Sequence, residues 1–392
     1  MTVTLKHIDF SEFDLIIIGG GCAGLSLSLA LLHFGYKGKV LVVERRKQYQ
    51  HDRTWSGWFS QTDLALLPNL SKRTFASWSI ANDSSQYSHT SNAFPYYSIS
   101  SEDFYTHALQ KINASQTVQL VTGTSLSSHD LMAMTQSRVI DTVGLGIEVT
   151  RPRYGLWQSF VGVMVSSSSP IFDMKTQSHA MLMADMSQDD KGFFFTYIIP
   201  QNSRQALVEV TYFTTQVLAA DYLTECSTQA AHRFIQHQQA FSDHQIMTMP
   251  IEHGHLPMWE ISKQSTHDHI TLAGNISGAL RSSSGYGFAT IQRWAQETAQ
   301  TLSSSEPLPG TPLVKPRYYS RWIQWMDNIF LIVLVRYPAQ SQTIFLQMAK
   351  ALKGDEFALF MSHRASLSIW VKVIMAMPKW PFIKAVWRSW LD

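Results

Sequence analysis

Three glycines near the start of the chain have the spacing of a dinucleotide-binding loop. Gly19, Gly21 and Gly24 form a G-x-G-x-x-G pattern. In such a loop the first glycine permits a tight turn, the second lets a pyrophosphate approach the backbone, and the third allows close packing of helix on strand. Glu44 follows Gly24 at the distance of about 20 residues where a carboxylate binds the adenosine ribose hydroxyls. We therefore predict a dinucleotide site; the alternative is an ordinary glycine-rich turn.

The flanking residues predict the elements that would position this loop. Residues 15–18 are apolar, uncharged and mostly β-branched, as expected of a strand buried on both faces. A helical stretch follows, and its free N–H groups would face the phosphates. Residues 40–43 predict the second strand, which ends at Glu44 and Arg45. This acidic–basic pair resembles the FAD site of flavoprotein hydroxylases more than that of simple NAD dehydrogenases.

A second candidate for chemistry is Glu209, an acid inside an apolar strand. Residues 193–200 and 205–213 carry the densest β-signals of the chain, and four polar residues separate them, which predicts a hairpin. Period-two alternation puts Leu207, Glu209 and Thr211 on one face and Val208, Val210 and Tyr212 on the other. The pattern alone favours a solvent-exposed Glu209, and the alternative is an acid buried for a purpose.

Two later segments predict further edges of the nucleotide-binding domain. An apolar strand over residues 138–141 ends at Asp141 and is followed by glycines. A strand over residues 269–274 opens into a Gly/Ser loop, and an amphipathic helix begins near Gly285. The free N–H groups of that helix could face an anionic or carbonyl-rich group.

Composition excludes several classes of function. The net charge of 392 residues is only +2, so no general attraction to nucleic acid is expected. Cys22 and Cys226 are the only cysteines, which excludes a disulfide framework or a cysteine-based zinc site and suits a reducing cytoplasm. His253 and His255 alternate on one segment without a third ligand candidate nearby, so we predict packing or exposure rather than metal binding.

The chain is expected to meet a membrane from one side, if at all. Residues 1–12 lack the apolar core of a signal peptide, and no uninterrupted apolar run approaches the ~20 residues of a spanning helix. After a proline-rich break at residues 307–316, the chain is helical and rich in Trp, Phe and Met. Residues 370–392 interleave aromatics with Lys and Arg. This segment is either a helical cap over the core or an interfacial anchor, and both can hold at once.

Taken in order, a set of motifs along the chain resembles the bacterial lycopene cyclases of carotenoid synthesis. The motifs that carry the resemblance are DLIIIGGGCAGL, HDRTW, LWQSFVG, LMADM, FTYIIP, LVEVT, SSSGYGF and ALFMS. The glycine motif is common to many flavoproteins. HDRTW, LVEVT and SSSGYGF in this order are much more specific, and the similarity runs from Phe13 to near the C-terminus.

The resemblance implies an α/β fold: a Rossmann-type FAD-binding domain of the flavoprotein hydroxylase type, an inserted β-rich substrate lobe and a helical C-terminal region. We assign residues 12–60, 101–165 and 266–306 to the FAD-binding domain. Residues 61–100 and 166–265 would form the substrate lobe, and residues 307–392 the helical region. The implied reaction closes the linear ends of lycopene, or a related linear carotenoid, into β-rings without net oxidation. It would use reduced FAD with NAD(P)H as reductant, at the inner face of the cytoplasmic membrane.

The resemblance also assigns residues. Glu209 matches the first acid of the family's acid motif and becomes a pocket acid, the expected catalytic acid, whereas Val210 replaces the second acid. Residues 141–144 depart from the usual Asp-Gly-Arg-Gly, and Asp185 departs slightly from the family's Met-Asp pair. The remaining expected positions are, for the cofactor, Gly19, Gly21, Gly24, Glu44, Arg45, Asp141, Gly274, Asn275, Gly285 and Tyr286, and, for the substrate, Trp55, Phe193, Phe195 and Tyr197.

Two rival functions remain at this stage. One is an FAD monooxygenase that acts on an isoprenoid, and the other is a carotenoid-binding relative that has lost activity, which the loss of the second acid favours. The number of ends closed, the β- or ε-ring outcome, the choice of NADH or NADPH and the oligomeric state all stay open.

Overall fold

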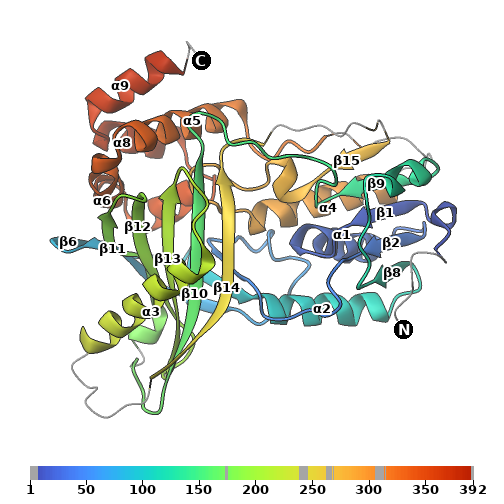
Figure 1. Cartoon of the computed structure of the whole chain (residues 1–392), viewed down its shortest axis with the longest axis horizontal. Helices are drawn as coiled ribbons and strands as arrows, with labels where there is room; N and C mark the ends of the chain where they lie inside the picture. The colour runs from blue at the N-terminus through green and yellow to red at the C-terminus, as the bar shows by residue number, and fades with distance from the viewer. Residues whose placement is uncertain are drawn as a thin grey trace.

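The computed structural model describes residues 8–172, 175–237, 246–261, 267, 269–304, 313 and 315–389. Figure 1 shows three parts: a parallel sheet with its helices on the right, a large, mostly antiparallel sheet in the middle, and helices above that sheet on the left. The N-terminus lies beside the parallel sheet, and the C-terminus lies at the opposite end of the molecule.

The parallel sheet carries the glycine loop. Its five strands have the order β15 (Ile270–Leu272), β9 (Arg138–Asp141), β1 (Leu15–Ile18), β2 (Val40–Val43) and β8 (Val118–Val121), and every pair is parallel. All residues of β1 and β2 are buried, as their uncharged sequence predicts. One face packs against the helices α1 (Cys22–His33), α2 (Ser101–Asn113) and α4 (Phe288–Ser304).

The second sheet has seven strands. Their order is β14 (Ile246–Met258), β10 (Leu156–Ser167), β13 (Gln205–Thr214), β12 (Phe193–Pro200), β11 (His179–Gln188), β5 (Ser77–Asn82) and β6 (Ser85–Thr90). The predicted hairpin is β12 and β13, with Tyr197 directly opposite Glu209. The helix α3 (Ala220–His237) covers the face that bears Val208 and Val210. The predicted alternation is therefore observed, and Glu209 lies on the face away from α3.

A small sheet joins the two large ones, and one predicted domain boundary is wrong. β7 (Tyr96–Ser100) pairs with both β3 (Thr54–Gly57) and β4 (Arg73–Phe75). Residues 156–165, predicted in the FAD-binding domain, lie instead in β10 of the seven-stranded sheet. An apolar run does not reveal which sheet it joins, and β10 forms antiparallel ladders with both β13 and β14.

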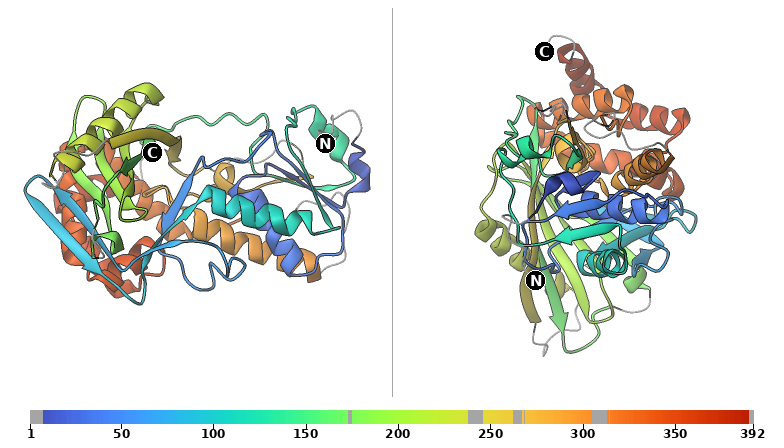
Figure 2. Two further views of the ribbon diagram at one scale, coloured as in Figure 1. Left: turned by 90° about the horizontal axis from the view of Figure 1, so that it is seen from below. Right: turned by 90° about the vertical axis from the view of Figure 1, so that its right-hand side faces the viewer.

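Helices of the C-terminal region cover the remaining face of the large sheet. They are α5 (Arg321–Arg336), α6 (Ser341–Ala351), α7 (Gly354–Met361), α8 (Leu367–Ala376) and α9 (Lys379–Arg388). Figure 2 shows the β5–β6 ribbon beside these helices, in agreement with the contacts of α6 and α7. The predicted proline-rich break and the end of segment 370–392 fall partly on residues 307–312, 314 and 390–392, which lie outside the described residues.

Within the described residues, no single helix is long and apolar enough to cross a membrane. One pair, Arg321–Arg336 with Pro338–Ala351, meets the length and composition criteria only when taken together, and it is bent by 109°. Most apolar side chains of α5 and α6 are buried against the large sheet, including Ile332, Val333 and Phe345.

Candidate active site

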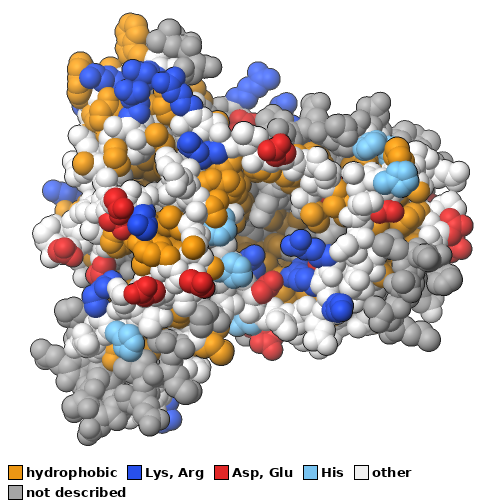
Figure 3. Space-filling model, viewed as in Figure 1, with side chains coloured by type: hydrophobic (Ala, Val, Ile, Leu, Met, Phe, Trp, Pro, Cys, Tyr) orange, Lys and Arg blue, Asp and Glu red, His pale blue; other side chains and the backbone are white. Residues whose placement is uncertain are grey.

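A cavity of about 670 Å³ opens where the parallel sheet faces the large sheet. This volume lies within the ~300–1,000 Å³ of typical cofactor and ligand pockets. Figure 3 shows the hollow between the two parts of the molecule, with side chains of all types around it. We name this hollow the polar cavity; its walls include Gly19, Gly21, Cys22, Glu44, Arg46, Arg53, Trp55, Asn275, Gly285, Tyr286, Glu209 and Glu252.

The glycine loop adopts the conformation that its spacing predicts. Gly19 has a φ of +98°, a left-handed conformation that side chains disfavour. A Cβ at Gly24 would lie 1.9 Å from the Gly19 carbonyl oxygen, so only glycine allows α1 to pack this closely on β1. Gly21 is the N-cap of α1 and provides no side-chain cap for the helix N–H groups. Gly19 and Gly21 line the cavity, whereas Gly24 serves packing.

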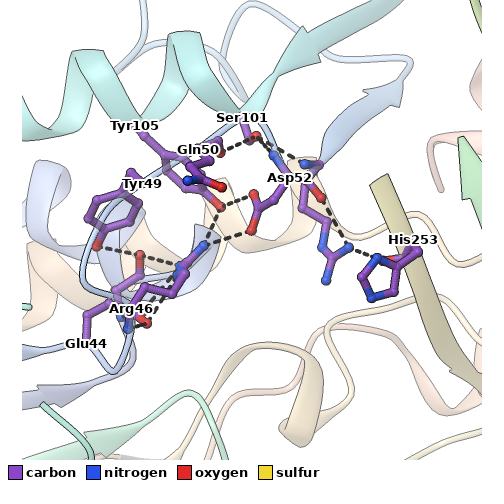
Figure 4. Close-up of polar contacts among 10 residues, drawn as sticks. Glu44, Arg46, Tyr49, Gln50, Asp52, Ser101, Tyr105 and His253 are labelled. Atoms are coloured by element: carbon purple, nitrogen blue, oxygen red, sulfur yellow. Dashed lines mark hydrogen bonds and ion pairs between the residues drawn. The ribbon is translucent and has the colours of Figure 1, made fainter. Parts of the chain in front are cut away.

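Glu44 lies at the carboxyl end of β2 and is held by the loop and by Arg46. Its carboxylate accepts hydrogen bonds from the Gly20 N–H (2.7 Å) and the Arg46 backbone N–H (2.8 Å), and forms an ion pair with Arg46 Nε (3.1 Å). Arg46 also donates to Asp52 and to the Tyr105 hydroxyl, as Figure 4 shows. Arg45, the basic residue predicted for the cofactor site, lines the cavity and is exposed. The basic residue that organises Glu44 is Arg46.

Besides Gly24, two predicted cofactor residues, Asp141 and Gly274, do not line the polar cavity. The buried Asp141 carboxylate accepts hydrogen bonds from the backbone N–H groups of Val143, Gly144 and Leu145, so it orders its own loop. This loop, rather than Asp141, presents residues to the cavity. Gly274 donates its N–H to the Tyr318 hydroxyl (2.8 Å), while the neighbouring Asn275 lines the cavity as expected.

The Gly/Ser loop before α4 brings Gly285 and Tyr286 to the cavity. Gly285 has a φ of +73°, a conformation that side chains disfavour, and a Cβ there would lie 2.4 Å from Gln158 Oε1 and displace that side chain. The Tyr286 hydroxyl is hydrogen-bonded with those of Tyr96 and Tyr197. Burial raises the pKa of all three phenols, which keeps them protonated and uncharged.

Glu209 lies on the cavity wall formed by the large sheet. Its side chain keeps some exposed surface, and that surface faces the cavity. Thr211 Oγ1 donates to Glu209 Oε1 (2.7 Å). Burial raises the pKa of Glu209 far above its ordinary value, and the charge of Glu252 raises it further; the Thr211 hydrogen bond and Arg53 oppose this shift. The exposure favoured by strand pattern alone is therefore wrong, because both faces of this strand are covered.

Glu252, on β14, is an acid of the cavity that the sequence analysis missed. It is 5% exposed and lines the same cavity as Glu209. Burial raises its pKa, while hydrogen bonds from the hydroxyl and backbone N–H of Thr54 and the charge of Arg53 lower it. The sequence feature that could have identified Glu252 is strand alternation. Glu252 and Leu256 stand four residues apart on one strand and so share a face, and both line the cavity.

A second cavity of about 360 Å³ adjoins the first, and we name it the apolar cavity. Ser284, Tyr197 and Tyr286 line both cavities, so this loop and these phenols form the boundary between them. The walls of the apolar cavity come from the large sheet and from the C-terminal helices; they include Trp58, Phe195, Phe213, Trp322, Phe345, Phe360, Trp370, Ile374 and Ile383.

The four predicted substrate residues separate into three groups. Trp55 lines the polar cavity, where its ring stacks on Phe288 at 5.5 Å. Tyr197 lines both cavities and Phe195 lines the apolar one. Phe193 lines neither: its ring stacks on Phe345 at 5.3 Å within the core. Strand alternation puts Phe193 on the same face as Phe195 and Tyr197. Phe193, however, is the first residue of β12, and α6 covers this end of the strand.

In the part of the chain that the structure describes, no group of three or more His, Cys, Asp and Glu is placed to hold a metal ion. His255 Nδ1 lies 3.0 Å from Ser159 Oγ, a hydrogen bond within the large sheet. His253 contributes its backbone carbonyl to Arg53 rather than its ring (Figure 4).

Comparison with solved structures defines the class of fold. The structure is similar to a geranylgeranyl bacteriochlorophyll reductase-like protein of Thermoplasma acidophilum (TM-score 0.57, 11% identity, 96% of this chain and 99% of that chain). It is also similar to p-nitrophenol 4-monooxygenase PnpA of Pseudomonas putida DLL-E4 (TM-score 0.53, 12% identity, 93% and 96%). A flavoprotein/dehydrogenase of Cytophaga hutchinsonii is a third such structure (TM-score 0.52, 12% identity, 92% and 99%). The predicted fold, that of the flavoprotein hydroxylase class, is confirmed.

Sequence comparison then identifies the family. The family described as "Lycopene cyclase protein" matches residues 14–386, nearly the whole chain. The chain therefore belongs to the lycopene cyclase family, as its motifs predict. No curated protein sequence gives a significant match.

Proposed function

We propose that this protein is a lycopene cyclase that closes the linear ends of lycopene into β-rings by acid-initiated carbocation chemistry, with FAD bound and without net oxidation. The observation that supports this most is the position of Glu209. An acid with a strongly raised pKa lies on the wall of a nucleotide-type cavity, one strand away from Tyr197 at the boundary with an apolar cavity.

The residues of the polar cavity fit FAD. The N-terminus of α1, without a side-chain cap, and the glycine loop would receive the pyrophosphate. Glu44, oriented by Arg46, would bind the adenosine ribose, and Asn275 with the Gly285–Tyr286 loop would lie along the other half of the cofactor. Bound in its reduced form, FAD would supply an electron-rich ring that stabilises positive charge in the site.

Glu209 would start the reaction. Protonation of a terminal carbon–carbon double bond needs an acid that keeps its proton at neutral pH, which burial provides here. The tertiary cation that forms is attacked by the neighbouring double bond, and loss of a proton then sets the ring double bond. The rings of Trp55 and Tyr197 line the same cavity and can stabilise a cation through their faces.

The apolar cavity would receive the polyene, and we propose that it opens toward a membrane surface. Trp322, Ile374 and Ile383 line this cavity and are also 48%, 41% and 48% exposed. Around them, further large apolar side chains of α8 and α9 are exposed: Leu367, Val371, Met375, Trp380 and Trp387. Figure 3 shows hydrophobic and basic side chains gathered over these helices. Such a surface suits peripheral binding to anionic lipid.

We further propose that NAD(P)H reduces the flavin and that the protein works at the inner face of the cytoplasmic membrane. A C40 hydrocarbon resides in the bilayer, so an enzyme that acts on it must reach it from the surface. Flotation with anionic vesicles tests this: the double variant Trp380→Ser/Trp387→Ser should float at least about tenfold less than the wild type. A double variant that floats like the wild type would reject the anchor.

The decisive test is expression in lycopene-accumulating cells, followed by pigment analysis. The wild type should yield carotenoids with β-rings, and Glu209→Gln should leave lycopene unchanged although it still binds FAD. The variant Glu297→Gln, on the exposed face of α4, is the matched control and should cyclise normally. Cyclisation by Glu209→Gln would reject the proposed acid.

A monooxygenase is the second candidate, because the fold is shared with proteins such as p-nitrophenol 4-monooxygenase. Oxygen separates the two functions. A cyclase should form rings anaerobically once its flavin is reduced, whereas a monooxygenase would consume oxygen with NAD(P)H and insert an oxygen atom into the product. An inactive carotenoid-binding relative would return lycopene unchanged under both conditions.

A further inference from the structure

Glu209 and Glu252 occupy the same row of the large sheet, on either side of one glycine. On the central strand β10, Gly162 pairs with Glu209 of β13 on one side and with Glu252 of β14 on the other. Residues directly opposite one another in an antiparallel sheet point to the same face. A Cβ at Gly162 would lie 2.8 Å from Glu252 Cγ and 2.8 Å from Leu207 Cδ1, so the missing side chain leaves room for Glu252 to lie over β10 on the face that also bears Glu209.

The surroundings of the two carboxyl groups differ in a way that assigns the proton. Glu252 accepts two hydrogen bonds from Thr54, which favour its ionised form. Glu209 accepts one, from Thr211, and faces the negative charge of Glu252. The other titratable groups that act on the pair are Arg53, which favours both carboxylates, Asp52, which opposes ionisation of Glu252, and the uncharged phenols of Tyr197 and Tyr286. With one proton on the pair, the proton belongs on Glu209.

We propose that Glu252 is the catalytic base that removes the ring proton, so that Glu209 and Glu252 act as an acid–base pair; this inference rests on the proposed function. Glu209 gives its proton to the terminal double bond, which leaves a tertiary cation. The π electrons of the neighbouring double bond attack this cation, and the new carbon–carbon bond closes the ring. Glu252 then takes a proton from a carbon beside the resulting cation, and the electrons of the broken C–H bond form the ring double bond.

Atoms and electrons balance in this sequence. The pair begins with one proton on Glu209 and ends with one proton on Glu252, and the carotenoid gains and loses one proton. Return of the proton from Glu252 to Glu209 through the cavity that both side chains line restores the starting state. Glu252 thus supplies a second carboxyl group although Val210 stands at the position of the family's second acid.

The test uses purified full-length protein in D2O, without oxygen, with dithionite-reduced FAD and lycopene in phosphatidylcholine/phosphatidylglycerol vesicles. The wild type is compared with Glu252→Gln and with the control Glu297→Gln. Ring formation, deuterium in the recovered lycopene and flavin absorbance are measured at several pH values.

For Glu252→Gln we expect ring formation to fall at least about 100-fold, the size of a lost general base. Recovered lycopene should carry deuterium, since a cation that cannot lose its ring proton returns to substrate after exchange. The residual activity should decline toward alkaline pH at a lower pH than the wild-type activity does, because the charge of Glu252 no longer raises the pKa of Glu209.

Two outcomes overturn the inference: Glu252→Gln forms rings as fast as the control, or it loses ring formation and its recovered lycopene carries no deuterium. Failure of the proposed function itself would be distinguishable, since the wild type would then form no rings.

If Glu252→Gln fails to bind FAD, the variant Thr54→Val tests the role of Glu252 instead. Removing the Thr54 hydroxyl raises the pKa of Glu252, so the acid limb of activity should move to higher pH, and an unmoved limb overturns the inference.

Discussion

The two adjoining cavities contain buried carboxyl groups with opposite surroundings. In the apolar cavity, Asp327 is 4% exposed and forms an ion pair with Arg281 (3.2 Å), which also donates to the Phe360 carbonyl. In the polar cavity, Glu209 and Glu252 lie near each other, and burial raises the pKa of both. A buried acid with a dedicated cation fixes one element to another, whereas buried acids with raised pKa values are typical of functional sites.

The largest expected effect comes from breaking the structural ion pair. Asp327→Ala leaves the Arg281 guanidinium buried and uncompensated, which should lower the free energy of unfolding by about 3–5 kcal/mol. Urea unfolding followed by tryptophan fluorescence measures this loss. The double variant Arg281→Met/Asp327→Leu is the control and should stay within about 1–2 kcal/mol of the wild type. An Asp327→Ala protein as stable as the wild type would show that the pair does not join the 281–285 loop to α5.

In the polar cavity, the largest expected effect is on cofactor binding. Gly24→Ala would place its Cβ 1.9 Å from the Gly19 carbonyl oxygen, so α1 must shift away from β1 and the glycine loop must deform. We expect FAD affinity to fall at least about tenfold, the equivalent of about 1.4 kcal/mol. Flavin fluorescence titration measures this affinity.

Gly35→Ala is the matched control for that variant. Gly35 has a φ of +68° beyond the end of α1, and a Cβ there would meet nothing within 4 Å. The change should cost about 1–2 kcal/mol of stability through backbone strain and leave FAD affinity unaltered. Equal FAD affinities of the two variants would contradict the role of Gly24.

The carboxyl pair should also make stability depend on pH. The folded-state pKa of Glu209 is raised above its unfolded value, so the folded protein keeps a proton that the unfolded chain releases. Stability is then greatest below the unfolded value and falls as the pH rises toward the raised folded value. Melting temperatures of the FAD-free protein should decrease across this window, and Glu209→Gln should flatten the decrease. An identical pH dependence in both proteins would contradict the raised pKa.

The smallest expected effect lies at the boundary between the cavities. Tyr286→Phe removes the hydroxyl that is hydrogen-bonded with Tyr96 and Tyr197, at a cost of about 0.5–1.5 kcal/mol of stability. Ring formation should fall by less than about tenfold, because Glu209 and Glu252 keep their positions. A loss as large as that of Glu209→Gln would place Tyr286 in the proton pathway rather than at the boundary.

Several parts of the site follow from local sequence. The apolar strands at residues 15–18 and 40–43, the glycine spacing and the position of Glu44 determine a βαβ unit, since each depends on neighbours within one short segment. Likewise, the alternation in residues 205–213 correctly separates Leu207 and Glu209 from Val208 and Val210. Spacing alone does not determine which of two adjacent basic side chains turns back onto the loop, and in the structure it is Arg46 that contacts the Gly20 carbonyl.

Tertiary structure alone decided what covers each face and which strands are neighbours. The sequence by itself determined that the nucleotide-binding unit exists and which side of its strand Glu209 occupies. Only the assembled sheet placed β14 beside β10, and so brought Glu252, 43 positions away in the chain, into the row of Glu209. The physical reason is that alternation and turn chemistry act over a few residues, whereas the pKa of a carboxyl group depends on everything packed around it.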